Sequence, residues 1–275
     1  MTGNMIKQFV LKYVSIAIVF LLIFTLNCNR TQSSGLLHTP FKVLDKYEQN
    51  REYKLYLPES KSAYPLLVYF HGVISDGFKK IPTLKNYTGS PVEDTGLIDF
   101  CKLNKIALLV PKARYSYTFL NCKSYGWSPF AKEIDGIERI IDTVVKNYKI
   151  DKKNIYLSGI SAGAVLCHHL ANRRPEYYNA ILSHSQGYIS EDNIQLKPLN
   201  RKAKFGVVVC YTSGDYKNLI PICEQTYKEY KALGYKIVIL RNLLPKNHSW
   251  DKSSNRRFWN YLKKVGQYSG ARDEK

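Results

Sequence analysis

Residues 155–165 read IYLSGISAGAV, an apolar run that passes directly into a helix-forming run at a serine flanked by glycines. A turn from a strand straight into a helix imposes strained torsions on the residue at its apex. Bulky side chains two residues to either side would collide with the strand and the helix, and Gly159 and Gly163 remove that collision. The pattern predicts that Ser161 sits on a sharp turn with its hydroxyl above the edge of a sheet.

The rest of the chain carries the strands and helices that such a turn requires. An alternating run ends at Pro58, and nearly continuous apolar runs follow, which is typical of strands buried on both faces. The strand patterns are at 51–58, 65–72, 106–111, 154–160, 180–185, 205–213 and 236–243, and amphipathic helix patterns lie at 95–105, 128–148, 162–173, 221–233 and 255–265. This alternation predicts one α/β domain over residues 49–266, a mostly parallel sheet with helices on both faces. The carboxyl ends of its strands share one edge, where ligands usually bind.

A nucleophilic serine needs a general base and a carboxylate that orients it, and in this architecture they follow in the order serine, acid, histidine. His248 stands in LLPKNHSW after the last strand pattern and is the predicted base. His184 ends an earlier strand and is expected to line the pocket or to pack. Asp215, at the end of VVVCYTSGD, is the predicted acid, with Asp192 or Glu191 as the alternative.

The oxyanion that forms during acyl transfer needs two N–H donors. Ala162, the residue after the nucleophile, supplies one from the first turn of the helix, where the helix dipole also favours negative charge. We expect the second from Val73, just beyond His71 and Gly72 in the turn that follows the 65–72 strand. His168 and His169 ride on the helix behind the nucleophile and are expected to be structural.

Several blocks of the chain resemble one branch of a known family. PLLVYFHG, GWSP, the long block IDGIERIIDTVVKNYKIDKKNIYLSGISAGAVLCHHLANRRPEYYNAILSHSQG and the segment from GDYKNLIP to NHSW look like successive parts of the polyhydroxybutyrate depolymerase and feruloyl esterase-like branch of the α/β-hydrolases. The resemblance covers roughly residues 50 to 262. By resemblance, Ser161, Asp215 and His248 fall on the triad of the family, and Trp127 and Asp135 on recurring positions that we take as structural.

The chain departs from the family pattern at three places near the predicted site. The sharp turn with Gly159, Ser161 and Gly163 is the nucleophile elbow of the family. Ala164 follows Gly163 at a position where the family often has another glycine. Thr212 stands three residues before the acid, where the family often has a glycine. Gly214 comes directly before the acid instead, so the acid loop is expected to be locally reshaped. The oxyanion turn also lacks a run of glycines. These departures bear on substrate and rate rather than on the triad.

The amino terminus has the form of an export signal. Lysines at 7 and 12 precede an apolar stretch over 13–26, which is shorter than the roughly 20 residues of a spanning helix. Residues 1–27 are therefore a predicted signal of the lipoprotein type with Cys28 as the acceptor, although Asn27 replaces the usual small residue. An uncleaved anchor and ordinary cleavage are the alternatives, and each places the remaining chain in or beyond the cell envelope. Residues 28–48 are a predicted polar tether and 267–275 a polar tail.

Charge and cysteine content narrow the possible partners. The formal net charge is +19, but the 41 lysines and arginines are scattered without a block of five like charges, so we predict no nucleic-acid partner. Metal-ligand spacings of the CxxC or HExxH type are absent, and no metal or cofactor is expected. The five cysteines beyond Cys28 are an odd number, so at least one thiol is free or paired between chains. Cys167 and Cys210 stand in apolar patterns typical of buried free thiols.

Together these features predict a cell-envelope lipoprotein that carries a metal-independent serine esterase. Its expected substrates are short acyl, aryl or feruloyl esters, or polyester oligomers, and its expected membrane contact is the lipid at Cys28. Two alternatives stay open: a non-catalytic envelope protein that uses the hydrolase scaffold to bind acidic polymers, and a serine peptidase of the same fold. The sequence leaves the disulfide pattern and oligomeric state undecided.

Overall fold

The computed structural model describes residues 37–44, 50–60, 62–77, 89–119, 121–127, 131–188 and 203–266. All of them belong to one compact unit. The predicted signal with Cys28, the predicted tail 267–275 and the alternative acids Glu191 and Asp192 lie outside these residues.

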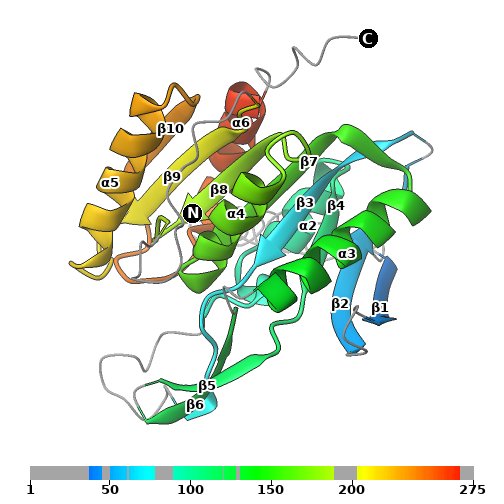
Figure 1. Cartoon of the computed structure of the whole chain (residues 1–275), viewed down its shortest axis with the longest axis horizontal. Coiled ribbons are helices and arrows are strands. Elements are labelled where there is room, and N and C mark those ends of the chain that lie inside the picture. Colours follow the sequence, from blue (N-terminus) through cyan, green and yellow to red (C-terminus); the bar gives the residue numbers. More distant parts are fainter. Residues whose placement is uncertain are drawn as a thin grey trace, which may run out of the picture. The chain divides into compact units, whose positions relative to one another are not determined.

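An eight-stranded sheet forms the centre of this unit, with the strand order β1-β2-β4-β3-β7-β8-β9-β10 (Figure 1). Strand β2 pairs antiparallel with both β1 and β4, and the remaining neighbours pair parallel. The strands are β1 (Leu37–Leu44), β2 (Asn50–Leu57), β3 (Tyr64–Phe70), β4 (Ala107–Pro111), β7 (Ile150–Ile160), β8 (Ala180–His184), β9 (Gly206–Thr212) and β10 (Ile237–Leu243). The mostly parallel sheet confirms the predicted fold class.

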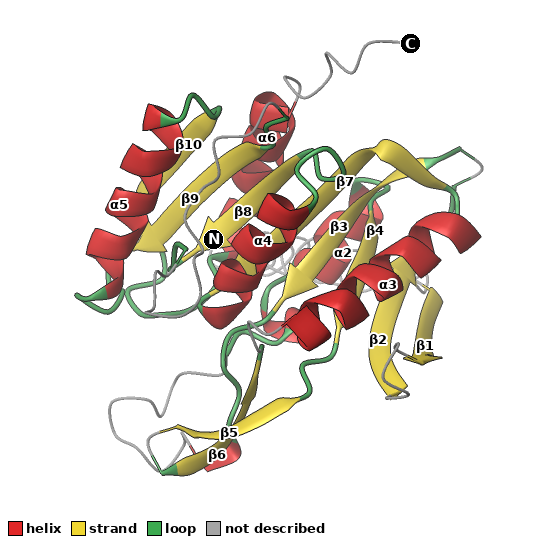
Figure 2. Ribbon diagram, in the orientation of Figure 1, coloured by secondary structure: helices red, strands yellow, loops and turns green. Residues whose placement is uncertain are grey.

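Helices cover both faces of the sheet (Figure 2). They are α2 (Leu97–Leu103), α3 (Ala131–Asn147), α4 (Ala162–Arg173), α5 (Leu219–Ala232) and α6 (Asn255–Gly266), with short 3-10 turns η2 (Val92–Asp94) and η3 (Lys252–Ser254). Helices α3, α4 and α5 contribute to one buried apolar cluster, and α2 and α6 contribute to the other. Among the described residues, no helix is long and apolar enough to cross a bilayer.

Strand β3 shows why the central runs are continuously apolar. Its residues alternate between the two clusters, with Val68 and Phe70 in one and Leu67 and Tyr69 in the other. Because successive side chains of a strand point to opposite faces, a strand between two helical layers must be apolar throughout.

Two elements differ from the sequence prediction. Residues 37–44, predicted as part of a tether over 28–48, form strand β1, which pairs with β2 from Leu37 opposite Leu57 to Leu44 opposite Asn50. Pro40 within this stretch is compatible with a strand only at a sheet edge, which is where β1 lies. Between residues 111 and 128, where the sequence analysis gives no strand or helix pattern, the chain forms an antiparallel hairpin of β5 (Tyr115–Phe119) and β6 (Cys122–Gly126).

The five cysteines of the described part of the chain are all free thiols. Cys101, Cys167, Cys210 and Cys223 are buried, and burial raises the pKa of each thiol, so these four stay protonated at neutral pH. This agrees with the expectation of buried free thiols at Cys167 and Cys210.

Candidate active site

The turn at Ser161 has the strained geometry that its glycines suggest. Ser161 lies between β7 and α4 with φ 54° and ψ −122°, in a region that favours glycine. A Cβ atom at Gly159 would overlap the Gly163 carbonyl oxygen, and one at Gly163 would overlap the Phe70 carbonyl oxygen. Both glycines are therefore needed for α4 to begin this close to β7 and β3.

The backbone of Ser161 is fixed on both sides. Its N–H donates to the His184 carbonyl at 2.9 Å, and its own carbonyl accepts from Ala164 at 2.9 Å. The first bond ties the apex of the turn to the end of β8, and the second begins helix α4. Ser161 is partly buried, so it stays accessible at the edge of the sheet.

His248 and Asp215 form a buried pair at the same edge. His248 Nδ1 lies 2.5 Å from Asp215 Oδ1, and the exposed fractions of the two side chains are 3% and 0%. Oδ1 also accepts from the Tyr216 N–H at 3.0 Å. Burial alone would raise the pKa of Asp215, but the hydrogen bond and charge of His248 and a hydrogen bond from Ser185 lower it below the usual aspartate value. Because an ionised carboxylate only accepts, the proton of neutral His248 sits on Nδ1, and Nε2 carries the lone pair.

Sheet topology explains why three distant segments converge. Strands β7, β8, β9 and β10 are consecutive neighbours, and Ser161, Asp215 and His248 follow β7, β9 and β10. Backbone bonds join the segments just past the strand ends, from Ser185 to the Cys210 carbonyl at 2.7 Å and from Ser213 to the Leu243 carbonyl at 2.9 Å. The predicted nucleophile, acid and base therefore lie at one edge, and the acid and base are in direct contact.

The acid loop is fitted to the base loop by the two residues that depart from the family pattern. The Thr212 hydroxyl donates to the Asn247 carbonyl at 2.6 Å, directly before His248. A Cβ atom at Gly214 would overlap the backbone of Lys246. Thr212 thus bonds the acid loop directly to the base loop, and Gly214 leaves room for the Lys246 backbone. The sequence alone did not predict this contact.

Behind the Asp215–His248 pair lies a second histidine, which packs rather than lines a pocket. His184 is fully buried and stacks on Trp250 with ring centroids 5.2 Å apart. Its Nδ1 lies 2.8 Å from the Ser185 hydroxyl, which in turn hydrogen-bonds Asp215. Burial lowers the pKa of His184 to about 4, so it is neutral at physiological pH.

The other sequence-predicted structural positions also have packing partners. His168 is buried between the Tyr230 and Ser183 hydroxyls, each 2.9 Å from a ring nitrogen. Asp135 forms an ion pair with Arg173 at 2.8 Å on the outer side of α3 and α4. These contacts bear on the fold rather than on chemistry at the sheet edge.

The turn after β3 is pinned on both sides of Val73. The Gly72 N–H donates to Gly89, and the Ile74 N–H donates to Tyr125 of the hairpin at 2.9 Å. Trp127 Nε1 holds the His71 carbonyl at 2.7 Å. Within the described residues, the N–H groups of Val73 and Ala162 have no backbone acceptor. Since Gly163 contacts the Phe70 and His71 carbonyls, these two N–H groups lie on adjoining segments.

No group of three or more His, Cys, Asp or Glu side chains in the described ranges could hold a metal ion. What this edge of the sheet offers instead is an alcohol on a strained turn, a buried carboxylate–imidazole pair and two N–H groups. This set of groups defines the class of serine hydrolases on an α/β scaffold.

Comparison with known families matches one part of the chain. Residues 108–202 match the family described as esterase PHB depolymerase. The match covers the elbow at Ser161 and the segment with Trp127 and Asp135, and it ends before Asp215 and His248. It bears out the resemblance seen in the sequence and the predicted enzyme class, a carboxylic ester hydrolase. No curated protein matches the chain.

Solved structures share the fold at low sequence identity. A thermostable esterase is 16% identical, with 84% of this chain and 62% of that chain covered and a TM-score of 0.53. A fluorophosphonate-binding serine hydrolase of Staphylococcus aureus is 12% identical, with 86% and 99% covered and a TM-score of 0.58. A ferulic acid esterase is 14% identical, with 85% and 98% covered and a TM-score of 0.55. These similarities establish the α/β-hydrolase fold.

Proposed function

We propose that the protein is a serine esterase in which Ser161 is the nucleophile, His248 the general base and Asp215 the orienting acid. The observation that carries the proposal is the buried contact of His248 with Asp215 at the edge that also presents the strained Ser161 turn. The N–H groups of Val73 and Ala162 form the proposed oxyanion hole.

Acylation follows from the protonation state of the pair. The Ser161 oxygen attacks the ester carbonyl carbon while its proton passes to His248 Nε2, and Asp215 stabilises the resulting imidazolium. Negative charge on the carbonyl oxygen is held by the two N–H groups. As the tetrahedral intermediate collapses, the ester bond breaks, and the imidazolium returns the proton to the leaving alcohol.

Deacylation repeats the steps with water. His248 removes a proton from the water that attacks the acyl-enzyme carbonyl, and the same proton then leaves with the Ser161 oxygen. The acid product departs and the free enzyme is restored, so neither a metal nor a cofactor enters the cycle.

The rim of the site favours hydrophobic esters among the expected substrates. Of the five large apolar side chains exposed in the described part of the chain, four lie on segments at the proposed site: Tyr115 and Tyr125 on the hairpin, Tyr216 beside Asp215, and Leu244 at the start of the base loop. The centroid of the Tyr216 ring lies 4.7 Å from that of the His248 ring. Apolar side chains exposed on segments beside a site can contact a hydrophobic ligand, and these four would suit aryl esters or polyester chains better than small polar esters.

Labelling with a fluorophosphonate tests the nucleophile. We expect one covalent adduct per chain, lost in Ser161→Ala and retained in Ser158→Ala, whose hydroxyl bonds the Val68 carbonyl inside the sheet. An adduct that persists in Ser161→Ala rules out this nucleophile. Unlabelled but folded protein that binds an acidic polymer would instead favour the non-catalytic binder.

Hydrolysis of nitrophenyl esters graded by acyl length, together with methyl ferulate and an oligomeric hydroxybutyrate, tests the substrate class. We expect the highest kcat/KM on the aryl or polyester substrates, and a loss on Tyr216→Ala that is larger for these than for nitrophenyl acetate. Equal losses on all substrates would contradict the role of this rim. Cleavage of peptide amides in preference to esters would favour the peptidase.

We also propose that Cys28 carries the lipid anchor and that the domain is held at the cell envelope. The support is the charged and apolar pattern of residues 1–27. Mass spectrometry of the mature protein tests it, with a diacylated amino-terminal Cys28 as the expected product and an intact residue 1–27 segment as the contradicting one.

A further inference from the structure

Helix α6 buries an apolar stripe and presents an uncompensated basic face. Phe258, Trp259, Leu262 and Val265 are buried against the sheet. The outward positions include five cations and no acid between residues 252 and 266: Lys252, Arg256, Arg257, Lys263 and Lys264, all exposed.

The cations of this face differ from several arginines elsewhere in the described residues, which have carboxylate partners. Four arginines elsewhere pair with carboxylates: Arg51 with Glu133, Arg173 with Asp135, Arg174 with Asp142 and Arg241 with Glu224. No carboxylate of the described residues forms an ion pair with the five cations of α6 and η3. Their charge is thus available to an external anion.

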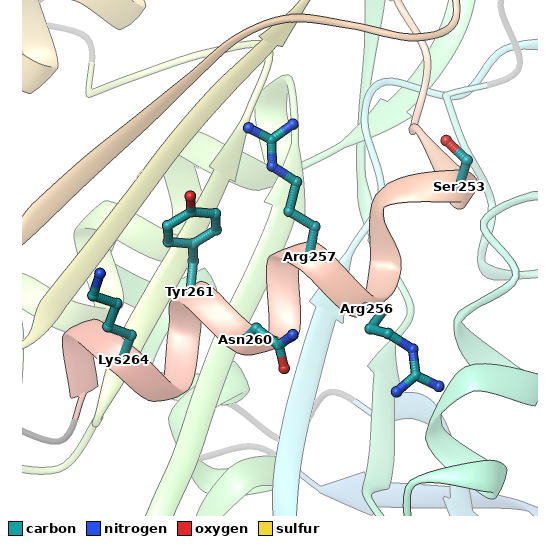
Figure 3. Close-up of a pocket in the computed structure, with 6 residues that line it drawn as sticks. All are labelled: Ser253, Arg256, Arg257, Asn260, Tyr261 and Lys264. Atoms are coloured by element: carbon teal, nitrogen blue, oxygen red, sulfur yellow. The ribbon is translucent and has the colours of Figure 1, made fainter.

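The shape of the face indicates the kind of anion. An open surface depression of about 580 Å³ is lined by Ser253, Arg256, Arg257, Asn260, Tyr261 and Lys264. Figure 3 shows that Arg257, Tyr261 and Lys264 extend to one side of the helix and that Arg256 extends to the other. The positive charges spread along both flanks rather than converge on one point, so they suit an extended anionic surface better than a single small anion.

We propose that the outer face of α6 docks onto an anionic phospholipid bilayer. Each lysine or arginine near such a surface adds to the attraction, and salt screens it. Tyr261 adds an aromatic ring with a polar tip, a side chain that prefers the headgroup region. Because the exposed face carries no apolar stripe, the contact is electrostatic and reversible, without insertion. The inference stands independently of the esterase proposal and of a lipid at Cys28.

Vesicle partitioning of the full chain tests the proposal. The readout is the ratio of binding to vesicles of phosphatidylglycerol and phosphatidylcholine over binding to phosphatidylcholine alone, at low and high salt. This ratio should fall at least tenfold in the triple variant Arg256→Glu, Arg257→Glu, Lys264→Glu. The matched control Lys217→Glu, Lys228→Glu, Lys231→Glu changes the net charge by the same amount at three exposed positions, one just before α5 and two on it. This control should keep most of the preference for anionic vesicles.

Both variants retain residues 1–35, so any membrane contact of that segment is common to them. Circular dichroism and Tm verify that both are folded. An α6 variant that keeps its preference for anionic vesicles overturns the proposal, and so does a control that loses as much, since net charge alone would then explain binding. Binding of a soluble acidic polysaccharide through α6, without binding of anionic vesicles, would overturn it in favour of a polymer partner.

Discussion

Ser185 adopts a backbone conformation that serine rarely takes, with φ 58° directly after β8. Its side chain is fully buried, its hydroxyl lies 2.8 Å from His184 Nδ1, and its hydrogen bond with Asp215 helps to lower the pKa of that carboxyl group. Strained non-glycine residues persist where the surrounding structure requires them, and often at functional sites. We therefore interpret Ser185 as a positioning residue that acts through the ionised Asp215.

Substituting Ser185 by alanine removes one hydrogen bond to a buried carboxylate. We expect kcat/KM for a nitrophenyl ester to fall about tenfold, consistent with the usual strength of a bond to a charged group. The acid limb of the pH–rate profile should move to higher pH, because a carboxylate with one donor fewer attracts the imidazolium more strongly. Ser158→Ala, a second buried serine, is the control; a fall in rate with an unmoved acid limb in Ser185→Ala would indicate a merely structural role.

At this scale, the sequence predicts residues whose roles follow from local geometry. Ser161, Gly159 and Gly163 lie within five positions, and the constraint among them is a property of one turn. The contributions of Ser185 and Thr212 could not be predicted, because each acts on a segment about 30 residues or more away: Thr212 bonds Asn247, and Ser185 bonds Asp215. Side chains of this type leave no spacing pattern.

The proposed oxyanion turn depends on elements outside the main sheet. Trp127 follows β6, its ring lies tilted against that of His71 with ring centroids 4.9 Å apart, and its Nε1 donates to the His71 carbonyl. The β5–β6 hairpin also pairs with Ile74. The position of Val73 is thus set by contacts from a hairpin about 50 residues later in the chain.

Trp127→Phe keeps a ring in place but removes the Nε1 donor. We expect kcat to fall about tenfold with little change in KM, because the oxyanion donor is displaced where charge develops while ground-state binding is kept. Steady-state kinetics on one ester would show this. Trp259→Phe is the control, because Trp259 lies on α6 and packs against Tyr156 of β7, away from the turn. An effect of Trp127→Phe that is confined to KM would contradict the assignment.

Central elements were predictable and peripheral ones were not. Strands buried on both faces must be apolar throughout, so β3, β4, β7, β8 and β9 are plain in the sequence. Strand β1 contains Pro40 and alternates with polar residues, as an edge strand permits, and it reads as coil. The hairpin does have a signal in the sequence: aromatic residues alternate at Tyr115, Tyr117 and Phe119 before a turn in which Asn121 has φ 59°.

The molecule as a whole buries several histidines without charge. Desolvation lowers the pKa of His71, His169 and His184 to about 4 and that of His168 to about 3. The unfolded chain, with histidine pKa values near 6.5, binds more protons than the folded chain between these limits. The contribution of these neutral histidines to the free energy of unfolding is therefore fully present above about pH 6.5, and it is lost as the pH falls toward 4.

Urea unfolding at pH 7 and pH 5 measures this dependence. Between pH 7 and pH 5, each buried histidine should lower the free energy of unfolding by on the order of 1–2 kcal/mol. The urea concentration at the unfolding midpoint should therefore be clearly lower at pH 5. His169→Gln should reduce the difference in unfolding free energy between the two pH values by about the contribution of one histidine. A midpoint that is unchanged or higher at pH 5 would contradict the neutral state of these side chains.

The edge position of β1 matters for anyone who shortens the chain for crystallisation. A recombinant form that starts at residue 49 would delete the partner of β2 and uncover its N–H and C=O groups from Asn50 to Leu57. An open strand edge is a template for intermolecular pairing. Truncation should stop ahead of Leu37, and samples cut further in are expected to precipitate or form mixed oligomers.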